Sequence, residues 1–138
     1  MSIKGTFPLV ALAALLTASQ ALAGGTATIT ISHQMRGCHV WQIGKGQPQP
    51  TLSITLKAGT VLRFVNNDVM PHKLVQQAGP QLVVAHANLN RLSASTSVKL
   101  AAKGVYRFTT KPGGDYAWAK SMKTSGEDYV LHLTVHAK

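Results

Sequence analysis

Hydrophobic and polar residues alternate with a period of two along most of the chain, which is typical of half-buried β-strands. The clearest runs are TATITI at 26–31, LSITL at 52–56, VLRFV at 61–65 and VYRFT at 105–109. Further strands are predicted at 72–76, 97–100 and 129–136. Turns rich in Gly, Pro and Asn separate these short runs, a pattern that predicts an all-β fold, specifically a β-sandwich.

The same alternation assigns some residues to the surface. His132 and His136 alternate with apolar residues in the last strand, so both are predicted to face solvent. His86 has no candidate partner nearby in the sequence and is predicted to be a structural histidine. Residues 81–92 lack the alternation, and they are predicted to form either a short helix or a loop that crosses between the sheets.

The first 23 residues follow a different pattern. Lys4 provides a positive charge, residues 7–16 form the apolar run FPLVALAALL, and Ala21-Leu22-Ala23 matches a small-residue cleavage site. The run is too short to cross a hydrocarbon core of about 30 Å as a helix. We therefore expect a signal peptide at 1–23 and a single domain at 24–138. The mature protein is expected to be periplasmic or secreted, without stable membrane insertion.

The chain is strongly basic, with a formal net charge of +10. Its Lys and Arg residues are scattered singly rather than clustered, and no aromatic row lies between them, which argues against nucleic acid as a partner. The excess charge instead favours acidic protein partners. With only four Asp and Glu residues, and without a Gly-rich oxyanion loop, the chain is not expected to be an enzyme.

One short segment concentrates residues that bind soft metals. Residues 33–41 read HQMRGCHVW and contain the single cysteine, Cys38. A lone cysteine in an exported protein excludes an internal disulfide, so it pairs with another molecule, packs inertly or binds a metal. Thiolate, imidazole and thioether together select copper. Cys38 and His39 are the leading candidates, with a bend at Gly37 needed to turn both toward one ion.

Residues 54–68, ITLKAGTVLRFVNND, followed by PHKLV at 71–75, resemble the cupredoxins, the plastocyanin- and azurin-like copper proteins. The stretch GVYRFTT at 104–110, with residues 113–135, resembles the last hairpin of that family. The resemblance implies a Greek-key β-sandwich with copper at one end.

The family's usual ligands are a histidine after the Asn-x-Asp turn, then a cysteine, a second histidine and often a methionine in the last loop. The resemblance places the first of these at His72 and the methionine at Met122. Thr110 stands where the family has its cysteine, and no histidine lies between Thr110 and Tyr129. In the resembled fold, the end of the first strand lies near the loop before His72. The predicted copper ligands are therefore Cys38, His72, His39 and Met122, with His33 and Met35 as alternatives.

Three functions remain open from the sequence. The first is single-electron transfer by a copper protein, with an acidic cytochrome or oxidase as the partner. The second is a periplasmic Cu(I) carrier or scavenger. The third is a metal-free sandwich that serves as an interaction module. Electron transfer is favoured because His72 lies in a turn between two strands, where its position is fixed.

Overall fold

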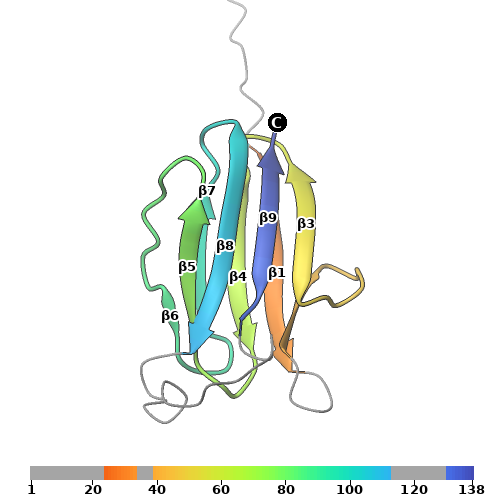
Figure 1. Ribbon diagram of the computed structural model, residues 1–138, viewed down its shortest axis with the longest axis vertical. Helices are drawn as coiled ribbons and strands as arrows, with labels where there is room; N and C mark the ends of the chain where they lie inside the picture. The colour runs from red at the N-terminus through yellow and green to blue at the C-terminus, as the bar shows by residue number, and fades with distance from the viewer. Residues whose placement is uncertain (1–23, 34–38, 113–129) are drawn as a thin grey trace, which may run out of the picture.

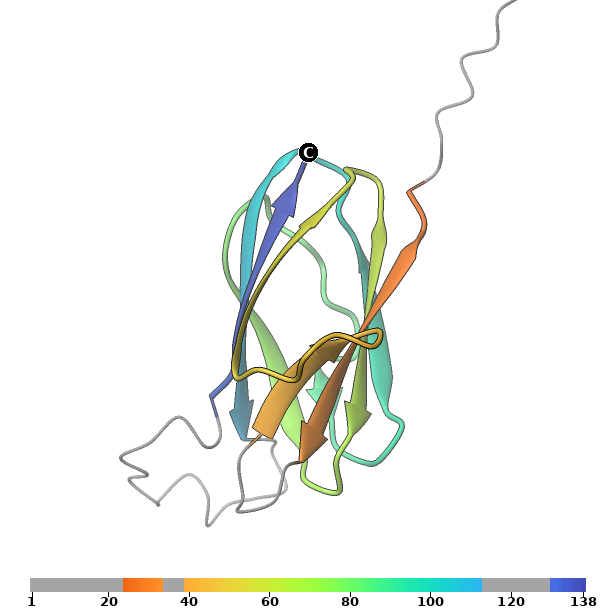
Figure 2. The same cartoon turned by 90° about the vertical axis from the view of Figure 1, so that its right-hand side faces the viewer.

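The computed structural model describes residues 24–33, 39–112 and 130–138, whose strands form two sheets packed face to face (Figures 1 and 2). One sheet has four strands in the order β2-β1-β4-β7. These strands are β2 (His39–Ile43), β1 (Thr26–His33), β4 (Val61–Asn67) and β7 (Ser95–Lys99). The other has five strands in the order β3-β9-β8-β5-β6. They are β3 (Thr51–Leu56), β9 (His132–Ala137), β8 (Gly104–Pro112), β5 (His72–Ala78) and β6 (Asn88–Leu89).

Both sheets are mixed. β1 runs parallel to β4, and β3 runs parallel to β9, whereas the other pairs are antiparallel. The chain passes repeatedly from one sheet to the other, as in a Greek-key arrangement. The prediction of an all-β sandwich is therefore confirmed.

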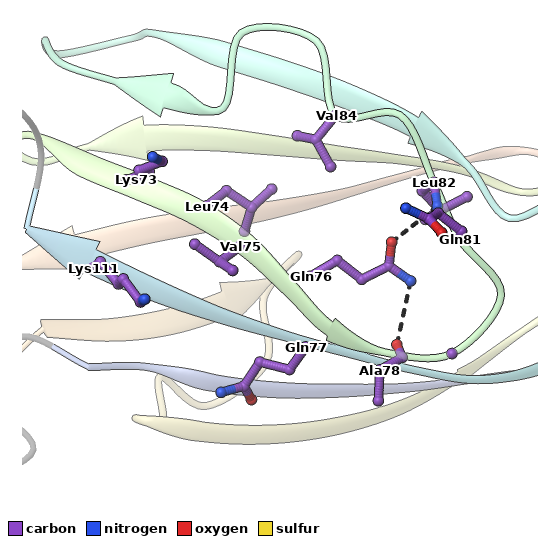
Figure 3. A pocket seen from close by; sticks show the side chains of 11 residues that line it. Lys73, Leu74, Val75, Gln76, Gln77, Ala78, Gln81, Leu82, Val84 and Lys111 are labelled. Carbon is purple, nitrogen blue, oxygen red and sulfur yellow. Dashed lines mark hydrogen bonds between the residues drawn. The ribbon is translucent and has the colours of Figure 1, made fainter.

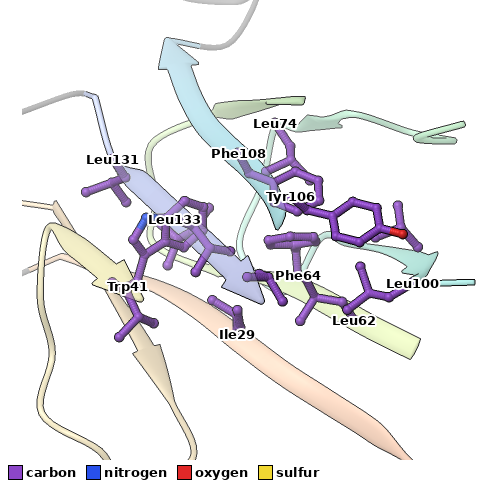
Figure 4. Packing of buried hydrophobic residues seen from close by; sticks show 14 of the residues in the cluster. Ile29, Trp41, Leu62, Phe64, Leu74, Leu100, Tyr106, Phe108, Leu131 and Leu133 are labelled. Atoms are coloured by element: carbon purple, nitrogen blue, oxygen red, sulfur yellow. The ribbon is translucent and has the colours of Figure 1, made fainter. Parts of the chain in front are cut away.

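The core lies between the two sheets and follows the predicted alternation (Figure 4). Phe64 of β4 sits at its centre, with its ring centroid 5.2 Å from that of Phe108 and 6.0 Å from that of Trp41. Aromatic pairs at such distances contribute beyond the area they bury. The other fully buried apolar side chains include Ile29, Ile31, Leu62, Leu100, Tyr106, Leu131 and Val135.

Two parts of the fold differ from or refine the prediction. β2 was not expected, because its HVWQI sequence begins inside the segment interpreted as a ligand cluster. Residues 81–92 form no helix; they form a loop that contains the short strand β6 before the chain crosses to β7. The described part of the chain contains no helix that is long and apolar enough to cross a membrane. The predicted signal peptide lies outside the described residues.

Candidate metal centre

At one end of the sandwich, the inward-facing positions change from apolar to polar. Alternate residues of a strand share a face, so each buried apolar residue predicts the direction of the residue two positions away. His33 follows Ile31 on β1, His39 precedes Trp41 on β2, Asn66 follows Phe64 on β4, and His72 precedes Leu74 on β5. The core face therefore ends in a group of polar side chains, and both sheets contribute to it.

His39 and His72 meet at the centre of this group. Their ring centroids are 4.9 Å apart and the rings are inclined by 75°. His39 is 1% exposed and His72 is 2% exposed. His39 starts β2 in the four-stranded sheet and His72 starts β5 in the five-stranded sheet. The pair therefore joins the two layers of the sandwich.

A third imidazole lies beside them at the edge. His33 pairs with His39 in the β1–β2 register, and the two ring centroids are 5.3 Å apart. The side chain of His33 is 45% exposed. His33 therefore lies on the solvent side of the group.

The carboxylate of Asp68 contacts both buried histidines. Its Oδ2 atom lies 2.8 Å from Nε2 of His39 and 3.0 Å from Nε2 of His72. Its Oδ1 atom lies 4.0 Å from Nδ1 of His33. Asp68 is itself 2% exposed, and a buried carboxylate is costly unless hydrogen bonds and opposite charge compensate it. The three imidazoles surround this carboxylate.

The turn after β4 holds Asp68 in place. The backbone N–H of Asp68 donates to Oδ1 of Asn66 (2.9 Å), and the backbone N–H of Met70 donates to Oδ1 of Asp68 (3.2 Å). Nδ2 of Asn66 donates to the carbonyl oxygens of Met70 (2.8 Å) and Leu89 (2.9 Å). The side chain of Asn66 thus fixes the turn and also connects it to β6.

Two titratable groups of this network, Asp68 and His72, have shifted pKa values. Burial alone would raise the pKa of Asp68, but the hydrogen bonds from His72 and Met70 and the positive charge of protonated His39 or His72 hold it below its ordinary value. Burial lowers the pKa of His72, as does repulsion from His39, and the contact with Asp68 opposes this only in part. Near neutral pH, an ionised Asp68 therefore faces a neutral His72.

The structure brings together two of the four predicted ligands, His39 and His72. Cys38, Met122 and the alternative Met35 lie outside the described residues, so their role in binding stays a prediction. Thr110, which stands where the resembled family has cysteine, is fully buried. Its hydroxyl oxygen accepts a hydrogen bond from the N–H of Leu131 (3.1 Å) and thereby links the end of β8 to the chain entering β9.

The remaining histidines lie apart from this group. His132 and His136 lie on the outer face of β9, opposite its buried residues, as predicted. His86 is exposed in the loop before β6, where it adopts a positive φ of 55°. Trp41 is fully buried against Phe64 and, being two residues from His39 on β2, lies on the same face of that strand.

Asp68 is a residue of this candidate site that was not predicted from the sequence, because it was assigned only to the turn. Two signals in the sequence indicate it in retrospect. It continues the inward series of Leu62, Phe64 and Asn66, and it lies four residues before His72, with which it forms a hydrogen bond of 3.0 Å. No comparable signal in the sequence near Asp68 indicates that His39 lies close to it.

The donor atoms of this group fit a transition metal. Imidazole nitrogens suit copper and zinc, and a carboxylate oxygen can join them. Donor atoms of His33, His39 and Asp68 all lie within 4.8 Å of one another. These three residues could therefore hold a metal through imidazoles from β1 and β2 and the carboxylate of Asp68.

Comparisons with known proteins give only distant similarities. No family model and no curated protein matches the chain. Similar solved structures include a purple cupredoxin from Nitrosopumilus maritimus, at 19% identity over 79% of this chain and 98% of that chain, with a TM-score of 0.45. A cysteine protease inhibitor from Entamoeba histolytica matches at 6% identity over 83% and 96% of the two chains, with a TM-score of 0.46. A Cu(I) form of an amicyanin mutant matches at 16% identity over 80% and 82%, with a TM-score of 0.38. The solved structures similar to this chain therefore include cupredoxins.

Proposed function

We propose that this protein is an exported copper-binding protein that transfers single electrons. Its metal is held by His39 and His72 together with Cys38 and Met122. The observation that carries the proposal is the convergence of His39 and His72, from different sheets, at one buried end of the sandwich. The two imidazoles, each held by a different sheet, would supply two of the four proposed ligands in fixed positions.

The two ligands outside the described residues belong to segments attached to this same end. Cys38 directly precedes His39 in the sequence. Met122 belongs to the segment between Pro112, the last residue of β8, and Val130, and both β8 and the chain entering β9 meet this end of the sandwich (Figure 1). A thiolate and a thioether added to two imidazoles give a donor set that selects copper.

Electron transfer is favoured over copper carriage by the fixed position of the histidines. Each begins a strand, and each contacts Asp68, which the hydrogen bonds of Asn66 and Met70 hold in place. Ligands that keep one arrangement in both oxidation states suit rapid electron transfer. A carrier must instead release its metal, which a buried and rigid ligand pair opposes.

The proposed partner is an acidic redox protein, such as a cytochrome or oxidase. Asp68 is the single Asp or Glu among the described residues, and it is buried, so their exposed charged side chains are basic. The outer face of the five-stranded sheet carries Lys73, Lys111 and Arg107. Such a face attracts an acidic protein and accelerates its association at low salt.

Two of these lysines mark the part of the face nearest the metal site. Lys73 and Lys111 lie directly opposite each other in the β5–β8 register, one position from His72 and its partner Pro112. Like charges in this arrangement are destabilising. Lys73 and Lys111 also border one end of a groove of about 600 Å³ beside β5 (Figure 3). We place the docking of an acidic partner here, because its carboxylates would relieve the repulsion.

The test is copper loading of the mature protein followed by visible spectroscopy and voltammetry. We expect about one Cu(II) per chain, intense thiolate-to-copper absorption and a reversible redox wave. Cys38→Ser should abolish the absorption, whereas Ser53→Ala, on the outer face of β3, should leave it unchanged. Colourless protein that gives up Cu(I) readily to a chelator would favour a copper carrier. A protein that binds no copper would favour a metal-free interaction module.

A further inference from the structure

We propose that the protein self-associates through the free edge of its five-stranded sheet, where β3 of one copy pairs antiparallel with β3 of a second copy. The partner of this surface is therefore another molecule of this chain. The inference goes beyond the proposed function and does not depend on a bound metal. It is carried by the unpaired backbone groups of β3, the lack of charged side chains on β3 and β9, and apolar side chains left partly exposed at this edge.

The backbone groups of β3 point alternately toward β9 and away from it. The carbonyl oxygens of Pro50 and Leu56 each accept a hydrogen bond of 3.0 Å from a backbone N–H of β9 or of the residue after it. Even-numbered residues therefore face β9, and the odd-numbered ones, Thr51, Ser53 and Thr55, face the other side. No strand of the sheet lies there, and no hydrogen bond joins the backbone of these three to another described residue on that side.

The start of this edge is covered, whereas its middle is open. Gln49 exchanges two backbone hydrogen bonds with Trp41 of β2 (2.8 and 2.9 Å), and the connection at 44–48 projects beside the start of β3 in Figure 1. The pairing is therefore centred on Ser53 and Thr55. A two-fold axis perpendicular to the sheet makes the two copies of β3 antiparallel, so that these residues exchange N–H···O bonds across the axis.

The distribution of charge favours a second copy at this place. The chain has a formal net charge of +10, so two copies repel each other over most of their surfaces. β3 and β9 contain no Lys, Arg, Asp or Glu. Their outward side chains are hydroxyls and imidazoles: Thr51, Ser53, Thr55, His132, Thr134 and His136. An equally basic copy can approach here at lower electrostatic cost than at the other half of the sheet, where Lys73, Arg107 and Lys111 face outward.

The other edges that the structure describes carry features that oppose strand addition. β6 has only two residues, β7 ends in Lys99, and β2 is paired at Trp41 with Gln49. Short strands, edge lysines and covering segments are common protections of sheet edges. β3 has six residues, TLSITL, with neither proline nor charge. Its middle is therefore the edge that these protections leave open.

The core-facing side chains of β3 add an apolar contribution. Leu52 is 8% exposed, whereas Ile54 and Leu56 are only partly buried against the core. Across the axis these side chains would meet the same residues of the second copy, and such cross-strand pairs stabilise a sheet. Association also costs translational and rotational freedom, and the open edge is short. We therefore expect a weak dimer that forms at high protein concentration.

This arrangement keeps the proposed metal centre accessible. Because the two copies of β3 run in opposite directions, their metal ends lie at opposite ends of the dimer. β5, which carries Lys73, is separated from β3 by β9 and β8. The proposed docking face therefore remains free in each copy.

The test is sedimentation equilibrium of the metal-free mature protein from micromolar to millimolar concentration, with a reductant present so that Cys38 forms no disulfide. The average mass should rise from one chain toward two. It should rise more readily at high salt, because salt screens the repulsion between the basic copies. A protein that stays monomeric at every concentration and salt level, or association that weakens as salt rises, would overturn the proposal.

Substitutions locate the contact. Ser53→Lys places two ammonium groups near the axis, so it should weaken association by about tenfold or more. Ser97→Lys is the matched control, because Ser97 is the exposed middle residue of the edge strand β7 and the same charge is added there. It should weaken association much less. Equal weakening in the two variants would show that net charge, not the β3 edge, governs association, and would refute the proposal.

A second variant removes a backbone donor without adding charge. The N–H of Thr55 faces away from β9, so Thr55→Pro breaks no hydrogen bond of the sheet, and proline is tolerated on such edge positions. We expect the variant to fold, as thermal unfolding of dilute protein would show, and to stay monomeric. A folded Thr55→Pro that associates like the unmodified protein would contradict pairing at this edge. Because no copper is used, the outcome is independent of whether the protein binds copper or transfers electrons.

Discussion

The two ends of the sandwich differ in how many buried polar side chains take part in closing them. At the end opposite the metal centre, backbone hydrogen bonds join the strands: Gly59 N–H donates to Leu100 O (2.7 Å), Leu100 N–H donates to Thr60 O (2.9 Å), and Ala58 N–H donates to Lys138 O (2.9 Å). At the metal end, backbone bonds such as that from Asn66 N–H to Ala94 O (2.8 Å) also occur, but buried side chains add further connections, through Asn66, Asp68 and the histidines. Figure 1 shows these two ends at the top and bottom of the view.

This difference supports the proposal that the metal end carries the function. Backbone bonds depend little on the identity of the side chain, so the far end could be built from many sequences. The network at the metal end depends on particular polar groups, which cost free energy to bury and are stabilised by hydrogen bonds such as those of Asn66, Asp68 and His72. A fold that required only a closed sandwich would not need them.

The largest expected effect comes from breaking the apolar core that both ends share. Phe64→Ala removes the ring that contacts Trp41 and Phe108, and we expect it to lower the free energy of unfolding by about 3–5 kcal/mol. Denaturant unfolding of metal-free protein measures this. Val83→Ala, at a side chain 91% exposed, should change stability by less than about 0.5 kcal/mol. An equal loss in both variants would contradict the placement of the core.

The next effect separates the metal end from the rest of the molecule. His72→Ala should weaken copper binding by more than about 100-fold, because losing a ligand costs more than losing an outer contact. It should also lower metal-free stability by about 1.5–3 kcal/mol, since Asp68 loses a hydrogen bond to its charge. Titration with copper and thermal unfolding measure the two effects. The control is His132→Ala, on the outer face of β9. If His132→Ala lowered copper affinity as much as His72→Ala, the result would contradict the proposed site.

Acid should weaken the metal end selectively. The pKa of His72 is lower in the folded state than its ordinary value of about 6.5. Below about pH 6.5 the unfolded chain therefore binds more protons than the folded chain, and the free energy of unfolding decreases as the pH is lowered. The pKa of Asp68 is also lowered, so a second loss begins below about 4. Each group contributes at most about 1.4 kcal/mol per pH unit. Metal-free thermal melts between pH 8 and 3 check this, and stability that rises on acidification would contradict both shifts.

A smaller effect is expected at the opposite end. The hydroxyl of Tyr106 donates to the carbonyl oxygen of Ala102 at 2.7 Å. Tyr106→Phe should therefore lower stability by about 1 kcal/mol and leave copper affinity unchanged. Parallel measurements of unfolding and copper titration test this, and a change in affinity would show that the two ends are coupled.

The smallest expected change in stability concerns the outer face beside the metal end. Lys73→Gln removes one of two opposed positive charges and should stabilise the protein by a few tenths of a kcal/mol. It should also slow reduction by an acidic cytochrome at low salt. Lys99→Gln, on β7 in the other sheet, is the charge-matched control. Equal slowing in the two variants would indicate steering by net charge rather than docking at Lys73.

The sequence by itself determined the class of fold and much of its detail. Alternation is a local property, because the polarity of each strand residue indicates which face of the sheet that residue occupies. It therefore predicted most strands and the outward direction of His132 and His136. The strand predicted at 72–76 also placed His72 correctly at the start of β5. β2 was missed because HVWQI is short and begins within a segment rich in possible ligands.

Only the tertiary structure decided which side chains meet. His39 and His72 come together because β2 and β5 begin at the same end of opposite sheets, and such contacts depend on the pairing of distant strands. Asp68 acquired its role in the same way: the sequence showed a turn residue, whereas packing enclosed its carboxylate among three imidazoles. The chemistry of a residue can be read from its type, but its partners are set by which strands pair and how the sheets pack.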